Sequence, residues 1–182
     1  MMTGDLFGLY LMRNCFGNSM IKELFILIKM LFGKEPKDIE GVTLMGMNHF
    51  PFRGYAYIMW CGKMIYRNDM YDRRQKEWPT DAHRISKNHE LIHLAQAKRC
   101  GSWAKYYWAY FKEWLKGNPI INPASSAYLT IPFEVEAYAN EEDPEYWKHY
   151  DGNNLKKYTL KNRKKLYRKI GRENWLNYIK GL

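Results

Sequence analysis

Two histidines and a glutamate lie within one five-residue run, His89-Glu90-Leu91-Ile92-His93. In an α-helix, residues four apart lie about 40° apart around the axis and one turn apart along it, so both imidazoles can reach one metal ion. Glu90 is turned about 100° from His89 and can accept a proton from a water on that ion. The run therefore predicts a zinc-dependent hydrolytic centre on a helix.

A catalytic zinc ion usually has three protein ligands, so the two histidines need a third partner from elsewhere in the chain. The candidates are the remaining histidines and two downstream glutamates: His49, His83, His149, Glu134 and Glu136. On a helix, two residues two positions apart point about 200° away from each other, so only one of the two glutamates can face the ion. The residues alone leave the choice of the third ligand open.

The segment from Phe133 to Asn140 resembles the Glu-x-x-Ala signature on the second helix of the gluzincin metallopeptidases. In that family the first glutamate is a zinc ligand and the alanine permits close helix packing. The resemblance therefore implies Glu134 as the third ligand and Ala137 beside the active-site helix. The ImmA/IrrE-like metallopeptidases have asparagine or aspartate directly after this alanine. This chain has Tyr138 there, and Glu136 stays an alternative ligand.

The wider pattern resembles small, mostly uncharacterised metallopeptidases of bacteria and their phages. It consists of Asn-His-Glu-x-Ile-His-x-x-Gln, an aromatic helix, and then Phe-Glu-x-Glu-Ala-Tyr-x-Asn. The resemblance covers about residues 45 to 147, and Lys87 departs from the longer zincin pattern, which usually has an uncharged residue there. It implies a zinc-dependent metallopeptidase that hydrolyses peptides or proteins, with Glu90 as the general base.

Further polar residues near these two helices are candidates for supporting roles. Gln96 lies one turn beyond the second histidine, and Asn140 lies near the end of the second helix, so either could orient a ligand. Tyr138, His149 and Tyr150 are candidates for stabilising an oxyanion. Because the chain contains 15 tyrosines, such candidates also arise by chance.

The elements that must position these residues follow from hydrophobic spacing and from helix-breaking residues. Helices are expected over about residues 19–32, 86–99, 103–114, 132–140 and 160–179. Strands are expected over residues 41–47 and 55–66, with a turn at Cys61-Gly62-Lys63 inside the second run. Residues 67–82 are polar and are expected to form a loop.

This order predicts one α+β domain over residues 1–182. It comprises an N-terminal helical segment (1–40), a catalytic core (41–150) and a basic C-terminal helix (151–182). In the core, a small antiparallel sheet packs on a mainly helical, zincin-like bundle. The outer strand, residues 55–60, offers an edge to which an extended peptide substrate could add.

The net charge of +10 is concentrated at the C-terminal end. Residues 151–182 carry 10 Lys and Arg against 2 Asp and Glu, which gives +8, whereas residues 1–150 carry 19 against 17, which gives +2. This separation from the histidines argues against a nucleic-acid enzyme. The helix at 154–182 suits an acidic partner, either a protein, a nucleic acid or a lipid surface. The alternative function is a catalytically silent, zincin-like binding or phage-associated structural protein that acts through this helix.

Cysteine usage and hydropathy bear on the compartment. Three cysteines without a CxxC pair indicate free thiols in a reducing environment. The apolar stretches 6–12 and 21–32 fall short of the roughly 20 residues that a membrane span needs, and the first lacks the basic flank of a signal peptide. We therefore expect a cytoplasmic protein. The aromatic stretch 103–114 is expected to pack against the active-site helix, and peripheral membrane contact is its other interpretation.

Overall fold

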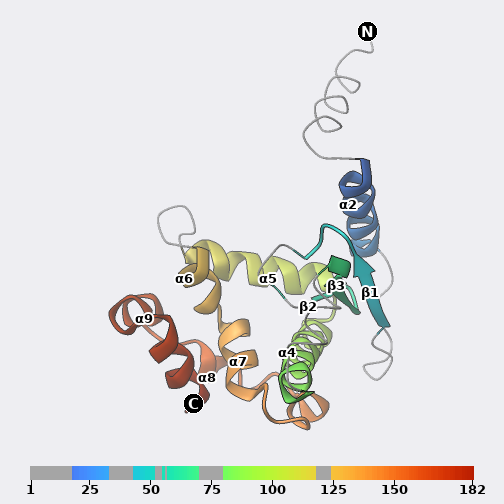
Figure 1. Cartoon of the computed structure of the whole chain (residues 1–182). Helices are drawn as coiled ribbons and strands as arrows, with labels where there is room; N and C mark the ends of the chain where they lie inside the picture. Colours follow the sequence, from blue (N-terminus) through green and yellow to red (C-terminus); the bar gives the residue numbers. More distant parts are fainter. Residues whose placement is uncertain (1–17, 33–42, 52–54, 56, 70–79, 118–123) are drawn as a thin grey trace. The chain divides into compact units, whose positions relative to one another are not determined.

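The computed structural model describes residues 18–32, 43–51, 55, 57–69, 80–117 and 124–182 (Figure 1). The chain has an α+β fold, as predicted, and divides into two compact units, Met1–Trp78 and Pro79–Leu182. The described strands belong to the first unit and the histidine-bearing helix to the second. Among the described residues, no helix combines the length and the hydropathy needed to cross a membrane.

The first unit contains one helix, α2 (Asn18–Leu31), and three strands, β1 (Thr43–Met47), β2 (Tyr57–Trp60) and β3 (Lys63–Arg67). The strand order is β1-β3-β2. Strands β2 and β3 are antiparallel, as predicted, but β1 runs parallel to β3, with Thr43 opposite Lys63. The sheet is therefore mixed instead of antiparallel throughout. Residue alternation identifies a strand but does not determine the direction in which it pairs with a non-adjacent neighbour.

The turn between β2 and β3 lies where the sequence predicts it. Cys61 and Gly62 both have positive φ, 49° and 81°. Two successive residues of positive φ form the type of two-residue turn whose twist matches that of the flanking strands.

Helix α2 is held on the sheet by hydrogen bonds from buried polar groups. The Glu23 carboxylate accepts the backbone amides of Asn48 at 2.7 Å and His49 at 2.9 Å. The Trp60 indole donates to the Leu27 carbonyl at 3.0 Å. The core of this unit is formed by Leu27, Met47 and Ile65.

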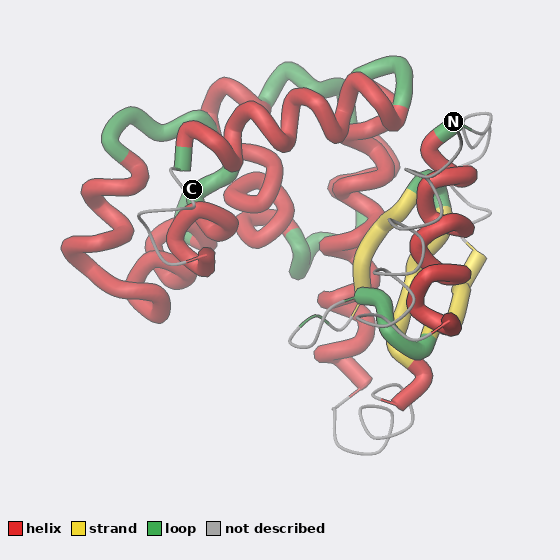
Figure 2. Tube along the Cα trace, turned by 90° about the horizontal axis from the view of Figure 1, so that it is seen from above, coloured by secondary structure: helices red, strands yellow, loops and turns green. Residues whose placement is uncertain are grey.

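The second unit is helical (Figure 2). Its elements are α4 (Thr80–Arg99), α5 (Trp103–Lys116), α6 (Ala124–Leu129), α7 (Pro132–Asn140), the 3-10 helix η1 (Tyr146–His149), α8 (Leu155–Tyr158) and α9 (Arg163–Lys180). Helix α4 packs against α5, α7 and η1, and α7 packs against α8 and α9. Helix α4 begins at Thr80, earlier than the predicted start near residue 86. The first turn is polar, so it shows no spacing of apolar residues from which a helix could be predicted.

Local residues explain where these helices begin and end. Gly101, with φ of 79°, follows the end of α4, and this left-handed conformation is typical of a residue just beyond a helix. The Ser102 hydroxyl then accepts the Lys105 amide at 3.2 Å and caps α5. Helix α7 begins at residue 132, as predicted, and Pro132 stands in its first turn, where the missing amide proton has no helical partner.

The basic C-terminal helix contributes to the core of the second unit. Trp175 and Ile179 of α9 are fully buried together with Leu129 and Val135. The Trp175 indole donates to the Leu129 carbonyl at 2.9 Å. Helix α9 is bent at Gly171, where φ is 79°. The apolar side of this helix therefore packs in the unit that carries the histidines, while its lysines and arginines lie on other sides.

Candidate metal centre

Three buried side chains of the second unit bring their donor atoms to one point. The two Nε2 atoms of His89 and His93 lie 3.2 Å apart. Oε2 of Glu134 lies 3.2 Å from His89 Nε2, and its Oε1 lies 3.2 Å from His93 Nε2. Zinc holds nitrogen and oxygen ligands tetrahedrally at about 2.0–2.2 Å, which places two ligands of one ion about 3.4 Å apart. The three side chains fit this spacing, and the group could hold a metal ion.

Two helices position this group. His89 and His93 lie one turn apart on α4, and Glu134 lies in the first turn of α7. Ile92 of α4 and Ala137 of α7 are completely buried, and the two helices pack against each other. The ligand set therefore depends on the packing of α4 against α7.

The outer nitrogen of His89 is held by a residue that the sequence analysis missed. Nδ1 of His89 lies 3.0 Å from Oε2 of Glu141, and the Asn88 amide donates to the Glu141 carbonyl at 3.2 Å. An ionised carboxylate can only accept hydrogen bonds, so Nδ1 carries a proton, and Nε2 is the nitrogen that can bind an ion when the ion replaces its proton. The signal for Glu141 was its spacing of two helical turns from Glu134, which gives both residues nearly the same angular position.

The outer nitrogen of His93 is held by Gln96, as the sequence predicted for an orienting residue. Nδ1 of His93 lies 2.8 Å from the Gln96 amide oxygen. The Gln96 amide nitrogen donates to the Phe133 carbonyl at 3.0 Å and to Oε2 of Glu136 at 2.8 Å. Since both of these groups act as acceptors, the amide can be oriented only one way, with its oxygen toward His93. Nε2 of His93 is therefore also the nitrogen that can bind an ion.

The alternative ligand, Glu136, contacts a different set of residues. Its carboxylate is completely buried and accepts hydrogen bonds from the Tyr146 hydroxyl at 2.9 Å, the Tyr150 hydroxyl at 3.1 Å and the Gln96 amide. This placement follows from the two-residue offset between the glutamates, which turns them to different sides of α7. Glu134 thus lies in the group with the histidines, and Glu136 lies behind Gln96.

Two tyrosines of α5 also reach the ligands. The Tyr106 hydroxyl lies 3.1 Å from Nδ1 of His93, and the Tyr110 hydroxyl donates to Oε1 of Glu134 at 2.7 Å. Both tyrosines belong to the aromatic stretch 103–114 that was expected to pack against the active-site helix, but these hydrogen bonds were not predicted. Their spacing of four residues, which puts two hydroxyls on one face, was the available signal.

The other predicted site residues lie at different distances from the centre. Glu90 is buried on α4 beside His89. Burial lowers the pKa of His89 and His93, and the charge of Glu90 is among the causes that raise it. The ring of Tyr138 meets that of His89 edge-on, with centroids 4.5 Å apart. Asn140 donates to the Glu136 carbonyl at 2.7 Å and to the Tyr158 hydroxyl at 2.9 Å, so it joins α7 to α8 and does not contact a ligand.

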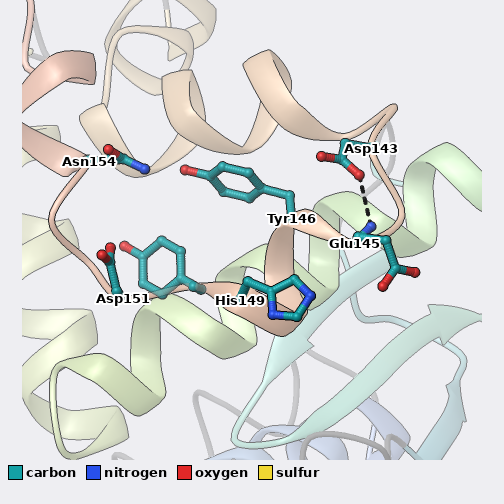
Figure 3. Close-up of a pocket in the computed structure, with 7 residues that line it drawn as sticks. Asp143, Glu145, Tyr146, His149, Asp151 and Asn154 are labelled. Carbon is teal, nitrogen blue, oxygen red and sulfur yellow. Dashed lines mark hydrogen bonds between the residues drawn. The ribbon is translucent and has the colours of Figure 1, made fainter.

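His149 lies outside the group of ligands. Together with neighbouring acidic and aromatic residues it lines a pocket of about 280 Å³ (Figure 3); the other lining residues are Asp143, Glu145, Tyr146, Tyr150, Asp151 and Asn154. Neither ligand histidine nor Glu134 lines this pocket. His49 lies in the first unit, and the side chain of His83 is outside the described structure.

The electrostatics of the group favour a cation at its centre. Burial lowers the pKa of His89, but the hydrogen bonds with Glu134 and Glu141 raise it by more than burial lowers it, and the resulting pKa is about 10. Burial also lowers the pKa of His93, and the charge of Glu134 raises it above its ordinary value. For Glu134, burial raises the pKa, and the two histidines lower it well below its usual range. These shifts mean that His89, His93 and Glu134 together favour positive charge between them. Protons or a metal ion can supply that charge.

Comparisons with protein-family models, curated proteins and solved structures gave no match. The resemblance to gluzincins therefore stays a prediction. The geometry establishes a buried group of two histidines and one glutamate that could hold a metal ion.

Proposed function

We propose that this protein is a zinc-dependent metallopeptidase of the gluzincin type. The observation that carries the proposal is the convergence of Nε2 of His89, Nε2 of His93 and the Glu134 carboxylate at mutual distances of 3.2 Å. Two imidazoles and one carboxylate are a ligand set of catalytic zinc sites, which leave a fourth position for water or substrate. The hydrogen bonds that Nδ1 of His89 donates to Glu141 and Nδ1 of His93 donates to Gln96 support the proposal, because both leave Nε2 as the ligand atom.

The chemistry divides between the ion and the chain. A zinc ion held by His89, His93 and Glu134 would supply Lewis-acid catalysis, since zinc lowers the pKa of a bound water towards roughly 7 and polarises a carbonyl oxygen. Glu90 accepts the proton of the attacking water and returns it to the leaving amine. Tyr138 keeps its hydroxyl proton, because burial and the charge of Glu134 raise its pKa. Its place beside His89 makes it the candidate donor to a developing oxyanion.

Metal analysis of the purified chain tests the proposal. Wild type prepared with zinc is expected to hold one ion per chain, and His89→Ala and His93→Ala are expected to hold none. His149→Ala is the matched control, because His149 lies apart from the ligands, and it should retain the ion. A wild-type protein that takes up no zinc at neutral pH overturns the metal centre.

Peptidase assays test the remaining part of the proposal. Wild type should cleave a fluorescent casein or members of a peptide library, should lose this activity with a chelator and should regain it with zinc. A zinc-loaded wild type that cleaves none of these substrates overturns the peptidase and favours a zinc-binding protein without turnover.

A further inference from the structure

Helix α5 has two faces of different character. Tyr106 and Tyr110 on one face contact the ligands of the metal centre. Trp108, Phe111 and Leu115 are exposed, by 60%, 42% and 48%. These three positions lie within about 60° of one another around the helix axis and on the side opposite the two tyrosines. The second unit therefore presents an apolar stripe to solvent, directly behind the helix face that contacts the metal centre.

The exposed stripe is continuous. The Trp108 and Phe111 rings are stacked with centroids 6.1 Å apart, and the Phe111 and Trp114 centroids lie 5.8 Å apart. Single exposed apolar residues are normal on protein surfaces, but contiguous patches mark surfaces that bind something. The stripe is therefore a candidate surface for a partner with an apolar component.

The charges around the stripe are positive. Lys105, Lys112 and Lys116 are exposed on α5, and the Lys112 ammonium lies 5.9 Å from the centroid of the Trp108 ring. Glu113 is the acidic residue within α5, and its carboxylate is neutralised by Lys116 and by Arg163 of α9. The occupant is therefore expected to carry negative charge as well as apolar groups.

The salt bridge to Glu113 also brings the basic start of α9 to the end of this stripe. Burial lowers the pKa of Lys164, and the positive charges of Arg163, Arg168 and Lys116 lower it further. Lys164 follows Arg163 directly, and Arg168 lies about one helical turn beyond Lys164 on α9, so these cations extend from the end of α5 along the start of α9. The structure thus joins two features that are far apart in the sequence, the aromatic stretch and the basic C-terminal segment.

We propose that the exposed face of α5, together with this basic cluster of Lys116, Arg163, Lys164 and Arg168, docks on the surface of an anionic lipid bilayer. Tryptophan and phenylalanine side chains suit the boundary between headgroups and acyl chains, and lysines beside them can keep their charges in the headgroup layer. A nucleic acid fits less well, because Leu115 offers no ring on which a base can stack. The proposal is independent of whether the metal centre binds zinc.

Docking on this face has a consequence for the metal centre. Since Tyr106 and Tyr110 lie on the opposite side of the same helix, the ligands would stand about one helix diameter, roughly 10 Å, above the lipid surface.

Vesicle co-sedimentation of the full chain tests the docking surface. The probes are vesicles of phosphatidylcholine alone and vesicles that also contain phosphatidylglycerol, each at low and high salt. Binding is expected on the anionic vesicles at low salt and is expected to fall by at least about tenfold on neutral vesicles or at high salt.

The triple variant Trp108→Ser, Phe111→Ser, Leu115→Ser should lose binding to a similar extent. Leu44→Ser with Tyr178→Ser replaces exposed side chains elsewhere and should leave binding unchanged.

A charge-reversal variant, a DNA-binding assay and sedimentation velocity distinguish lipid docking from the other possible uses of this face. Lys112→Glu with Arg168→Glu reverses two exposed charges and should weaken binding by about fivefold or more for each site. Absence of vesicle binding by the wild type overturns the proposal. Binding of single-stranded DNA that the triple variant loses, without vesicle binding, assigns the face to nucleic acid instead. A dimer in sedimentation velocity that the triple variant makes monomeric assigns it to a subunit interface and equally overturns lipid docking.

Discussion

Gln96 accepts a hydrogen bond from Nδ1 of His93 at 2.8 Å, and the orientation of its amide is set by the opposite helix. Its nitrogen donates to the Phe133 carbonyl and to Glu136, both on α7. One amide side chain thereby connects the packing of α4 on α7 with the presentation of Nε2 of His93. Hydrogen bonds to the outer nitrogen of a metal-binding histidine commonly change metal affinity by 10- to 100-fold.

Replacing Gln96 should therefore weaken zinc binding more than it weakens the fold. Gln96→Leu has a similar volume but leaves Nδ1 of His93 with only the Tyr106 hydroxyl as a partner, so we expect zinc affinity to fall by about 10- to 100-fold. Titration with a competing chelator measures this change. Asn140→Leu is the matched control, because it removes a half-buried amide of α7 whose hydrogen bonds go to Glu136 and Tyr158 and not to the histidines or Glu134. Equal losses of zinc affinity in both variants would show that Gln96 acts only through stability.

The two glutamates of α7 should differ sharply in their effect on the metal. Glu134→Gln removes a ligand charge and should abolish zinc binding at micromolar concentrations. Glu136→Gln should leave zinc affinity within about threefold of wild type, because the hydroxyls of Tyr146 and Tyr150 can turn to donate or accept. Equilibrium dialysis against zinc distinguishes the two. The opposite order of affinities would identify Glu136 as the ligand.

Removing the carboxylate of Glu90 should separate metal binding from turnover. Glu90→Gln keeps the shape of the side chain but cannot accept the proton of the attacking water, and general-base catalysis contributes about 10²- to 10⁴-fold. We expect unchanged zinc content by metal analysis and a loss of casein cleavage of that size. A variant with full zinc content and full activity would exclude Glu90 as the base.

The salt bridge between α5 and α9 should make stability depend on pH. Burial raises the pKa of Glu113, but Lys116 and Arg163 lower it to a net value below the ordinary 4.5. The pKa of Glu113 is therefore lower in the folded chain than in the unfolded chain. The salt bridge stabilises the fold fully at pH values above the unfolded pKa, and this stabilisation is lost as the pH falls through the folded pKa. Glu113→Gln should cost about 1 kcal/mol at neutral pH and little at acidic pH where the carboxyl is protonated. Urea denaturation at both values measures the difference, and a pH-independent cost would contradict the assignment.

Trp175 should dominate the stability that α9 contributes. The side chain is completely buried and donates to the Leu129 carbonyl, so Trp175→Ala should lower the free energy of unfolding by about 3–5 kcal/mol. Trp175→Phe keeps most of the ring volume and should cost less. Urea denaturation followed by circular dichroism gives both values. If Trp175→Ala unfolds like wild type, α9 contributes little to the core.

Several features of the fold could be predicted from local sequence. The helix start at Pro132 and the turn at Gly62 could be predicted, because proline restricts and glycine extends the allowed φ of its own position. The start of α4 and the parallel pairing of β1 could not be predicted in this way. The first turn of α4 is polar, and the direction of β1 depends on a partner that is not its neighbour in the chain.

The sequence by itself determined that His89 and His93 share a helical face, since their spacing of four residues matches the helical repeat. It also determined that Glu134 and Glu136 cannot both face one point. Only the tertiary structure decided which of them does, because that depends on how α7 is rotated about its axis when it packs on α4. The same packing brings Glu141 and the α5 tyrosines to the ligands. Contacts between residues distant in the chain are made by whole helices coming together, and no local spacing contains that information.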